Sequence, residues 1–156
     1  SKSIYQDTLS MGISDINSMT FEAIWEYNKG KDIQSDHLKL AFEQKNRCTE
    51  QVNEIFDKFD FLALPSAQLF PFDKSIQFPS KINDINLDTY HRWLEVFILS
   101  SLLNLPTITI PVGFNENGLP MGMQIIAKNK DDLKLFAFAK IFEEIYNNSK
   151  HKPKLK

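Results

Sequence analysis

The chain has 156 residues, 42% of them hydrophobic and 24% charged, and its formal net charge at pH 7 is −2. That length suits one domain, which spans about 100–200 residues, so a single unit over residues 1–156 is expected. The mildly acidic composition offers no basic face for phosphates, so nucleic acid is excluded as an expected partner. No run of about 18 apolar residues occurs, so no membrane span is expected.

Cysteine and histidine are scarce, with one Cys and three His in the chain. A single cysteine excludes an internal disulfide and favours a reducing compartment, so a cytoplasmic location is expected. The polar opening, SKSIYQDTLS, lacks the apolar stretch of a signal peptide. The scattered His and Cys predict no metal site, and no cofactor is expected. An enzyme that uses His37, His91 and Cys48 stays open as an alternative.

Residues 1–18 show little periodicity, and two amphipathic helices are predicted after them. The shorter one covers residues 20–27 and should end at Gly30. The longer one should begin with Ser35 or Asp36 as its N-cap. Its apolar stripe recurs at gaps of mostly three and four and consists of Leu38, Ala41, Phe42, Cys48, Val52, Ile55, Phe56 and Phe59. Cys48 is interpreted as a core residue of this stripe rather than a nucleophile.

A strand and a long loop follow. DFLALP, residues 60–65, is a short apolar run closed by proline and predicts a buried strand. Residues 66–86 contain two prolines and no period, which predicts a loop. Loops of this length are uncommon in compact domains unless they are functional, so this one is interpreted either as the cover of a site or as a surface connection pinned by its phenylalanines.

The second half of the chain predicts a helix, two strands and a last helix. Residues 87–105 are apolar nearly all round a helix, with Asp88 as the candidate cap, so a buried helix is expected. TITIP and MGMQIIA, residues 107–111 and 121–127, predict two strands joined by a turn at Asn117-Gly118. The last helix should be capped by Asp131 and should turn these residues inward: Leu135, Ala139, Phe142 and Ile145.

The order of these elements predicts an α/β unit with a mixed sheet. Proline cannot donate to a strand ladder, so Pro106 should start the first of the two late strands, Pro111 should end it and Pro120 should precede the second. A buried helix beside so narrow a sheet suggests that a partner, or a further part of the same protein, covers it.

The proline-bracketed segment resembles the C-terminal portion of the amidase signature family. PTITIPVGFNENGLPMGMQII, residues 106–126, is similar to the family's Pro-x-(Ile/Val)-(Ser/Thr)-(Ile/Val)-Pro-x-Gly-Phe pattern and the Gly-Leu-Pro pattern after its turn. FDKFDFLALPSA, residues 56–67, is similar to another strand of the family. The resemblance covers residues 50–147 and implies the C-terminal part of the amidase-signature fold, a mixed β-sheet flanked by helices whose strand ends border the active site.

The family's chemistry uses a serine nucleophile, a second serine in a cis peptide and a lysine base. The nucleophile lies in a Gly/Ser-rich segment that this chain does not contain, and the Ser100–Ser101 pair lies in an apolar helix, so no catalytic residue is assigned. The resemblance implies the C-terminal half of an amidase, a C–N hydrolase acting on a linear carboxylic amide and inactive as this chain alone. The alternative is a binding or scaffold module that keeps the fold without catalysis, and the gene sequence upstream of Ser1 separates the two.

Four residues before the strands are the candidate substrate-binding residues: Tyr90, Trp93, Leu94 and Phe97. In glutamine-specific relatives an acidic residue aligns with Leu94, so the resemblance implies an aromatic or aliphatic amide as the small-molecule partner. The alternative is that all four pack the core. His91 and Arg92 are interpreted as a surface pair. An exposed sheet edge also predicts a homo-oligomer.

Overall fold

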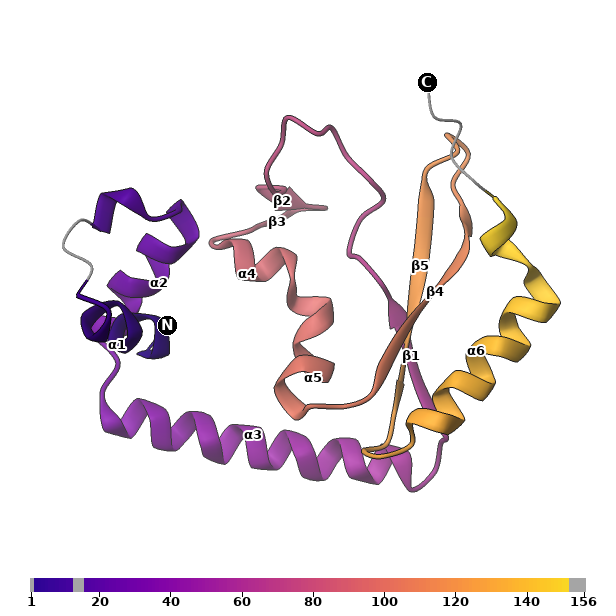
Figure 1. The fold of residues 1–156 in the computed structure, drawn as a ribbon, viewed down its shortest axis with the longest axis horizontal. Helices are drawn as coiled ribbons and strands as arrows, with labels where there is room; N and C mark the ends of the chain where they lie inside the picture. The colour runs from indigo at the N-terminus through magenta and orange to yellow at the C-terminus, as the bar shows by residue number, and fades with distance from the viewer. Residues whose placement is uncertain (1, 13–15, 152–156) are drawn as a thin grey trace. The chain divides into compact units, whose positions relative to one another are not determined.

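The computed structural model describes residues 2–12 and 16–151 (Figure 1). Its contacts divide the chain into two compact units, Ser1–Arg47 and Cys48–Lys156, where a single unit over residues 1–156 was expected. Among the described helices, none combines the length and the apolar character that crossing a bilayer requires.

The first unit is helical. It contains α1 (Lys2–Ser10), a 3-10 turn (Ile16–Ser18), α2 (Phe21–Lys31) and the beginning of α3 (Ser35–Phe56). The rings of Tyr5 and Tyr27 lie 5.1 Å apart between α1 and α2, and Tyr27 is buried. α1 was not expected from its sequence. The helix predicted over residues 20–27 is confirmed and starts at an N-cap, Thr20, which accepts a hydrogen bond from the backbone N–H of Ala23. It continues past Gly30, which is buried inside its last turn.

The long predicted helix is confirmed as α3. Ser35 and Asp36 lie inside its first turn rather than before it, so neither is the N-cap; instead the backbone N–H of Gln34 donates to Nδ1 of His37 at 3.2 Å. The apolar stripe is buried only in its second half, because Val52 and Phe56 contact the sheet through Ile126.

The sheet of the second unit has the order β1-β5-β4, with β1 at Phe61–Pro65, β4 at Thr107–Phe114 and β5 at Pro120–Ala127. The predicted strands and their connection are confirmed, but β1 is an outer strand without a fully buried residue, so the expectation of a buried strand is wrong. Both pairings are antiparallel, so the expectation of a mixed sheet is wrong for the described strands. Pro111 does not end β4 either: it pairs with Gly122, a register shift between Pro111 and Gly113 leaves Val112 as the extra residue of a bulge, and the strand continues beyond the bulge to Phe114.

Helices pack on both faces of this sheet (Figure 1). Adjacent residues of a strand point to opposite faces, so Ile125 contacts the face of α6 (Asp132–Tyr146) whereas Ile126 contacts the face of α5 (Glu95–Leu103) and the end of α3. The α6 cluster is completed by Phe61, Ile108, Ile110, Met123, Ala127, Leu135, Phe138, Ala139 and Phe142. The opposite cluster is completed by Cys48, Val52, Phe56, Leu62, Leu64, Leu99, Leu103 and Leu105.

The loop over residues 66–86 contains an element that the sequence did not predict. Its end forms a small hairpin of β2 (Lys81–Ile82) and β3 (Ile85–Asn86), which pair antiparallel. Asn83 adopts a φ of 51° at the turn, a left-handed conformation that asparagine tolerates better than most residues.

The helix predicted over residues 87–105 is broken. α4 (Tyr90–Trp93) ends at Leu94, and α5 begins at Glu95. Asp88 is not the cap: Thr89 occupies the N-cap position without a side-chain hydrogen bond. The expectation of a buried helix is also wrong, because neither α4 nor α5 has a buried residue. The sheet meets only one side of α5, so its other apolar side chains stay partly exposed.

The last helix is confirmed as α6, with two local corrections. Asp131 occupies the N-cap position, but its side chain makes no capping hydrogen bond. Leu135 is buried as predicted, whereas Ile145 is 68% exposed and does not face inward. The face that meets the sheet runs through Leu135, Phe138 and Phe142, and Ile145 lies to one side of it.

Candidate functional site

Cavities gather where β1 ends and β5 begins. Pro65 pairs with Met123, and the backbone N–H of Ser66 donates to the carbonyl of Gly122 at 2.9 Å, so the chain stays against β5 for one residue beyond the strand. Three described cavities share Met121 and Gly122 at this point. We call this region the strand-end site.

The first cavity of the strand-end site is aromatic. It measures about 170 Å³ and lies between the loop after β1, Trp93 of α4 and the start of β5. The rings of Phe72 and Trp93 meet edge to face, with centroids 5.3 Å apart at 77°. The other lining residues are Ser66, Ala67, Leu69, Phe70, Pro71, Pro120, Met121 and Gly122. An apolar cavity of roughly 150 Å³ holds a benzene ring, so this cavity has the size and character for one monocyclic group.

The two neighbouring cavities are more open, and one of them is lined by two residues with hydroxyl groups. One of about 340 Å³ is lined by Ser66, Thr109, Pro111, Pro120, Met121 and Gly122. The other, of about 280 Å³, is lined by Ala63, Leu64, Pro65, Val112, Met121, Gly122 and Met123. Across all three, the lining residues include no Lys, Arg, His, Asp or Glu. The strand-end site is therefore suited to bind an uncharged group.

Gly122 permits the close packing at the centre of the site. A Cβ atom there would lie 2.5 Å from Oγ of Ser66 and 3.0 Å from Cγ2 of Thr109, both shorter than a van der Waals contact. The missing side chain therefore lets both hydroxyl residues approach the strand backbone.

Gln124 is a buried polar residue two positions along β5 from Gly122. It is 1% exposed, and its Nε2 donates to the carbonyls of Pro65 at 2.9 Å and Val96 at 2.8 Å. Among the described residues, its Oε1 has no hydrogen-bond donor. The two carbonyls settle the orientation of the amide, because a flipped amide would place oxygen against oxygen.

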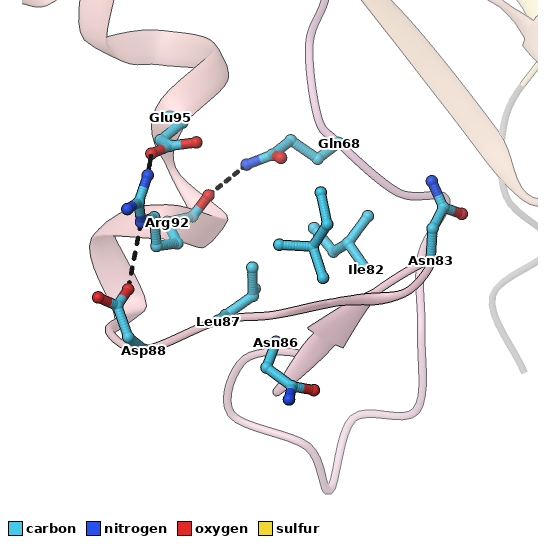
Figure 2. A pocket seen from close by; sticks show the side chains of 9 residues that line it. Gln68, Ile82, Asn83, Asn86, Leu87, Asp88, Arg92 and Glu95 are labelled. Carbon is cyan, nitrogen blue, oxygen red and sulfur yellow. Dashed lines mark hydrogen bonds and ion pairs between the residues drawn. The ribbon is translucent and has the colours of Figure 1, made fainter.

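A larger cavity of about 580 Å³ lies beside the small hairpin (Figure 2). Arg92 extends along its wall and pairs with Asp88 at 3.2 Å and Glu95 at 2.5 Å. The pKa of Arg92 is raised above its ordinary value, first by the hydrogen bond to Glu95 and then by the one to Asp88. The two carboxylates offset the guanidinium charge, so this cavity provides no net positive field for an anion.

The structure separates the four predicted substrate-binding residues. Trp93 lines the aromatic cavity of the strand-end site. Tyr90 instead lies against His91, with ring centroids 4.0 Å apart, and faces Phe78 at 6.5 Å. Leu94 sits at the helix break, and Phe97 lies on α5 beyond it; neither lines a described cavity.

Two kinds of site residue were missed from the sequence. The loop residues from Ser66 to Phe72 carry no period, and only their aromatic content beside a strand end marks them. Gln124 is the one polar side chain in MGMQIIA, residues 121–127. A polar residue in a strand that is otherwise apolar is a usable signal, because burial requires it to find hydrogen-bond partners.

The comparisons with known proteins concern most of the chain. The family model described as Amidase matches residues 3–136. A glutamyl-tRNA(Gln) amidotransferase component from Thermodesulfovibrio yellowstonii is 31% identical over 120 residues, which cover 76% of this chain and 23% of that protein. A fatty acid amide hydrolase of Oryza sativa subsp. indica is 31% identical over 101 residues, covering 65% of this chain and 16% of that protein.

Solved structures show the same fold. A bacterial aryl acylamidase of the amidase signature family superposes with a TM-score of 0.77 at 22% identity, over 98% of this chain and 34% of that one. A 6-aminohexanoate cyclic dimer hydrolase in complex with substrate has a TM-score of 0.75 at 15% identity, over 97% and 34%. The chain thus spans between 16% and 34% of the length of these four proteins. With a match over residues 3–136, this chain belongs to the amidase family.

Proposed function

We propose that this chain is the C-terminal part of an amidase that hydrolyses a carboxylic amide to an acid and ammonia or an amine. The observation that carries the proposal is the strand-end site, an uncharged, partly aromatic hollow formed by Trp93, Phe72 and Gly122. Family membership supports the reaction class, since similar proteins bear the names fatty acid amide hydrolase and aryl acylamidase.

In this proposal the chain builds one wall of the pocket and the reactive groups come from elsewhere in the protein. A serine hydroxyl needs a base within hydrogen-bond reach to attack an amide. Ser66 and Thr109 offer hydroxyls, but no basic side chain lines the described cavities around them. These hydroxyls are therefore assigned to the pocket wall rather than to catalysis.

The cavity also indicates a substrate class. An aromatic hollow of about 170 Å³ is matched to one ring or a short aliphatic group. Charged substrates would lose hydration there without gaining a partner. We propose a monocyclic aromatic or an aliphatic amide.

The chain by itself is expected to hydrolyse no amide, because the pocket wall lacks a nucleophile with its base. The measurement is the release of aniline from acetanilide and of ammonia from benzamide, with the purified 156-residue chain. A longer natural protein that carries this segment serves as the positive control. Enzyme-dependent turnover by the chain alone would contradict the assignment of catalysis to another part of the protein.

Trp93→Ala in such a longer protein is expected to raise the KM for an aryl amide roughly tenfold, since losing apolar contact with a ring-sized group costs about 1–3 kcal/mol. Acetamide, which has no ring, is the matched control substrate and should respond much less. An equal increase in KM for both amides would show that Trp93 does not contact the ring.

We also propose that the isolated chain self-associates through its sheet edges. Within the described sheet, β1 and β4 are the outer strands. Unpaired strand edges bind other strands, so light scattering should report dimers or larger species. A monomer that persists at high concentration would contradict this proposal.

A further inference from the structure

We infer that Gln68 and Gln124 are positioning residues that hold Trp93 in the wall of the strand-end site. We call the pair the glutamine clamp. Each amide donates two hydrogen bonds to backbone carbonyls: one of the four carbonyls lies at the end of β1, and the other three lie around the helix break at Leu94. This inference rests on the proposed function only in what it says about amide hydrolysis; the hydrogen bonds that carry it do not depend on that function.

Gln124 provides the first half of the clamp. Its Nε2 joins the carbonyl of Pro65, the last residue of β1, to the carbonyl of Val96 in the first turn of α5. A leucine in this place would avoid burying an amide oxygen that lacks a donor among the described residues. The value of glutamine here therefore lies in its two N–H groups, which connect the strand end to the helix.

Gln68 provides the second half. Its Nε2 donates to the carbonyls of Arg92 at 2.5 Å and Trp93 at 2.7 Å, and Figure 2 shows the amide reaching across to Arg92. The last carbonyls of a helix have no partner in the next turn. The four-residue helix α4 ends at Trp93, where Gln68 supplies a side-chain donor to the Trp93 carbonyl; the Arg92 carbonyl accepts from Gln68 in addition to the backbone N–H of Leu94.

The clamp connects the two walls of the aromatic cavity. One wall is the loop over residues 66–72, which starts after Pro65 and carries Gln68; the other is Trp93. Because Gln68 binds the backbone of Trp93 itself, it fixes the indole at the distance where it meets Phe72. Losing the clamp would let the helix break move away from the loop.

Substitution by glutamate tests the clamp, because glutamate has the shape of glutamine and, when ionised, no donor. Gln68→Glu and Gln124→Glu are made in a Trp25→Phe background, so that Trp93 is the remaining tryptophan of the two in the chain. Acrylamide quenching of Trp93 should rise roughly twofold in both variants, since the ring loses packing. Gln51→Glu on the exposed surface of α3 is the matched control and should leave quenching unchanged.

Lowering the pH distinguishes a lost donor from a general loss of structure. A protonated carboxyl group donates one hydrogen bond, and burial raises the pKa of a glutamate. Quenching of Gln124→Glu should therefore return partway toward the parent value between about pH 8 and about pH 5, while Gln124→Leu should not recover. Parallel behaviour of the two variants would overturn the inference. If Gln124→Glu does not fold, the half-exposed Gln68→Glu variant carries the comparison with Gln68→Leu as its partner, and the pH is then lowered to about 3.5, below the ordinary glutamate pKa of about 4.3.

The kinetics of a longer protein that carries this segment test the glutamine clamp and the proposed function independently of each other. If the clamp positions a pocket wall, Gln68→Glu raises the KM for an aryl amide more than it lowers kcat. Altered quenching with unchanged hydrolysis supports the clamp and overturns the pocket assignment. Unaltered quenching in both glutamate variants overturns the clamp, whatever the hydrolysis result.

Discussion

Ile126→Ala is expected to lower the free energy of unfolding by about 3–4 kcal/mol, within the usual range for truncating a buried isoleucine. The side chain of Ile126 is fully buried and contacts Val52 and Phe56 of α3. Truncation leaves a cavity that the strand and the helix are unable to close, because α6 packs on the other face of the same sheet. Urea unfolding followed by far-UV circular dichroism measures the change.

Ile145→Ala is the matched control. Ile145 is 68% exposed on α6, so the same truncation removes little packing and should change stability by no more than about 0.5 kcal/mol. The comparison also tests the corrected orientation of α6. A loss at Ile145 equal to that at Ile126 would show that this helix face is covered in solution.

Gly122→Ala is expected to destabilise the chain by about 1–3 kcal/mol, as insertion of a methyl group into a packed region does. The added Cβ would lie 2.5 Å from Oγ of Ser66 and 3.2 Å from its Cβ, with Thr109 at 3.0 Å. Rotation of the Ser66 hydroxyl relieves only the shortest of these contacts. Chemical denaturation measures the loss.

A double-mutant cycle with Ser66→Gly locates the cause. The second change removes both Ser66 contacts, so Gly122→Ala should cost at least about 1 kcal/mol less in the Ser66→Gly background than in the parent. Additive effects of the two substitutions would show that the strand-end site relaxes around the methyl group. The cycle needs no assumption about catalysis, since it reports packing alone.

The local patterns predicted the elements well where each pattern had one interpretation. Asn117-Gly118 and the apolar runs beside it predicted the β4–β5 connection, and the register of the two strands confirms it. The apolar spacing likewise predicted α3 and α6. The same spacing predicted one helix over residues 87–105, but the helix breaks at Leu94, where Gln68 and Gln124 from other segments donate to the carbonyls of Trp93 and Val96.

The candidate site was predicted only in part. Trp93 was selected as an apolar residue on a helix before the strands, and the structure places it in the aromatic cavity. Its partner Phe72 lies in a loop without a period, so no pattern along the chain paired the two rings. Phe97 lies beyond the helix break on α5, whereas Tyr90 shares α4 with Trp93 but packs against His91 and Phe78 instead.

The sequence by itself determined the late hairpin, the main helices and the resemblance to amidases, because turn chemistry and apolar periodicity act between residues a few positions apart. The tertiary structure decided which apolar faces are covered, where the helix before β4 breaks and which carbonyls the buried Gln124 binds. Gln124 and Pro65 are 59 positions apart. A hydrogen bond between them is set by the pairing of β1 with β5 and the packing of α5, and both exist only once the chain has folded.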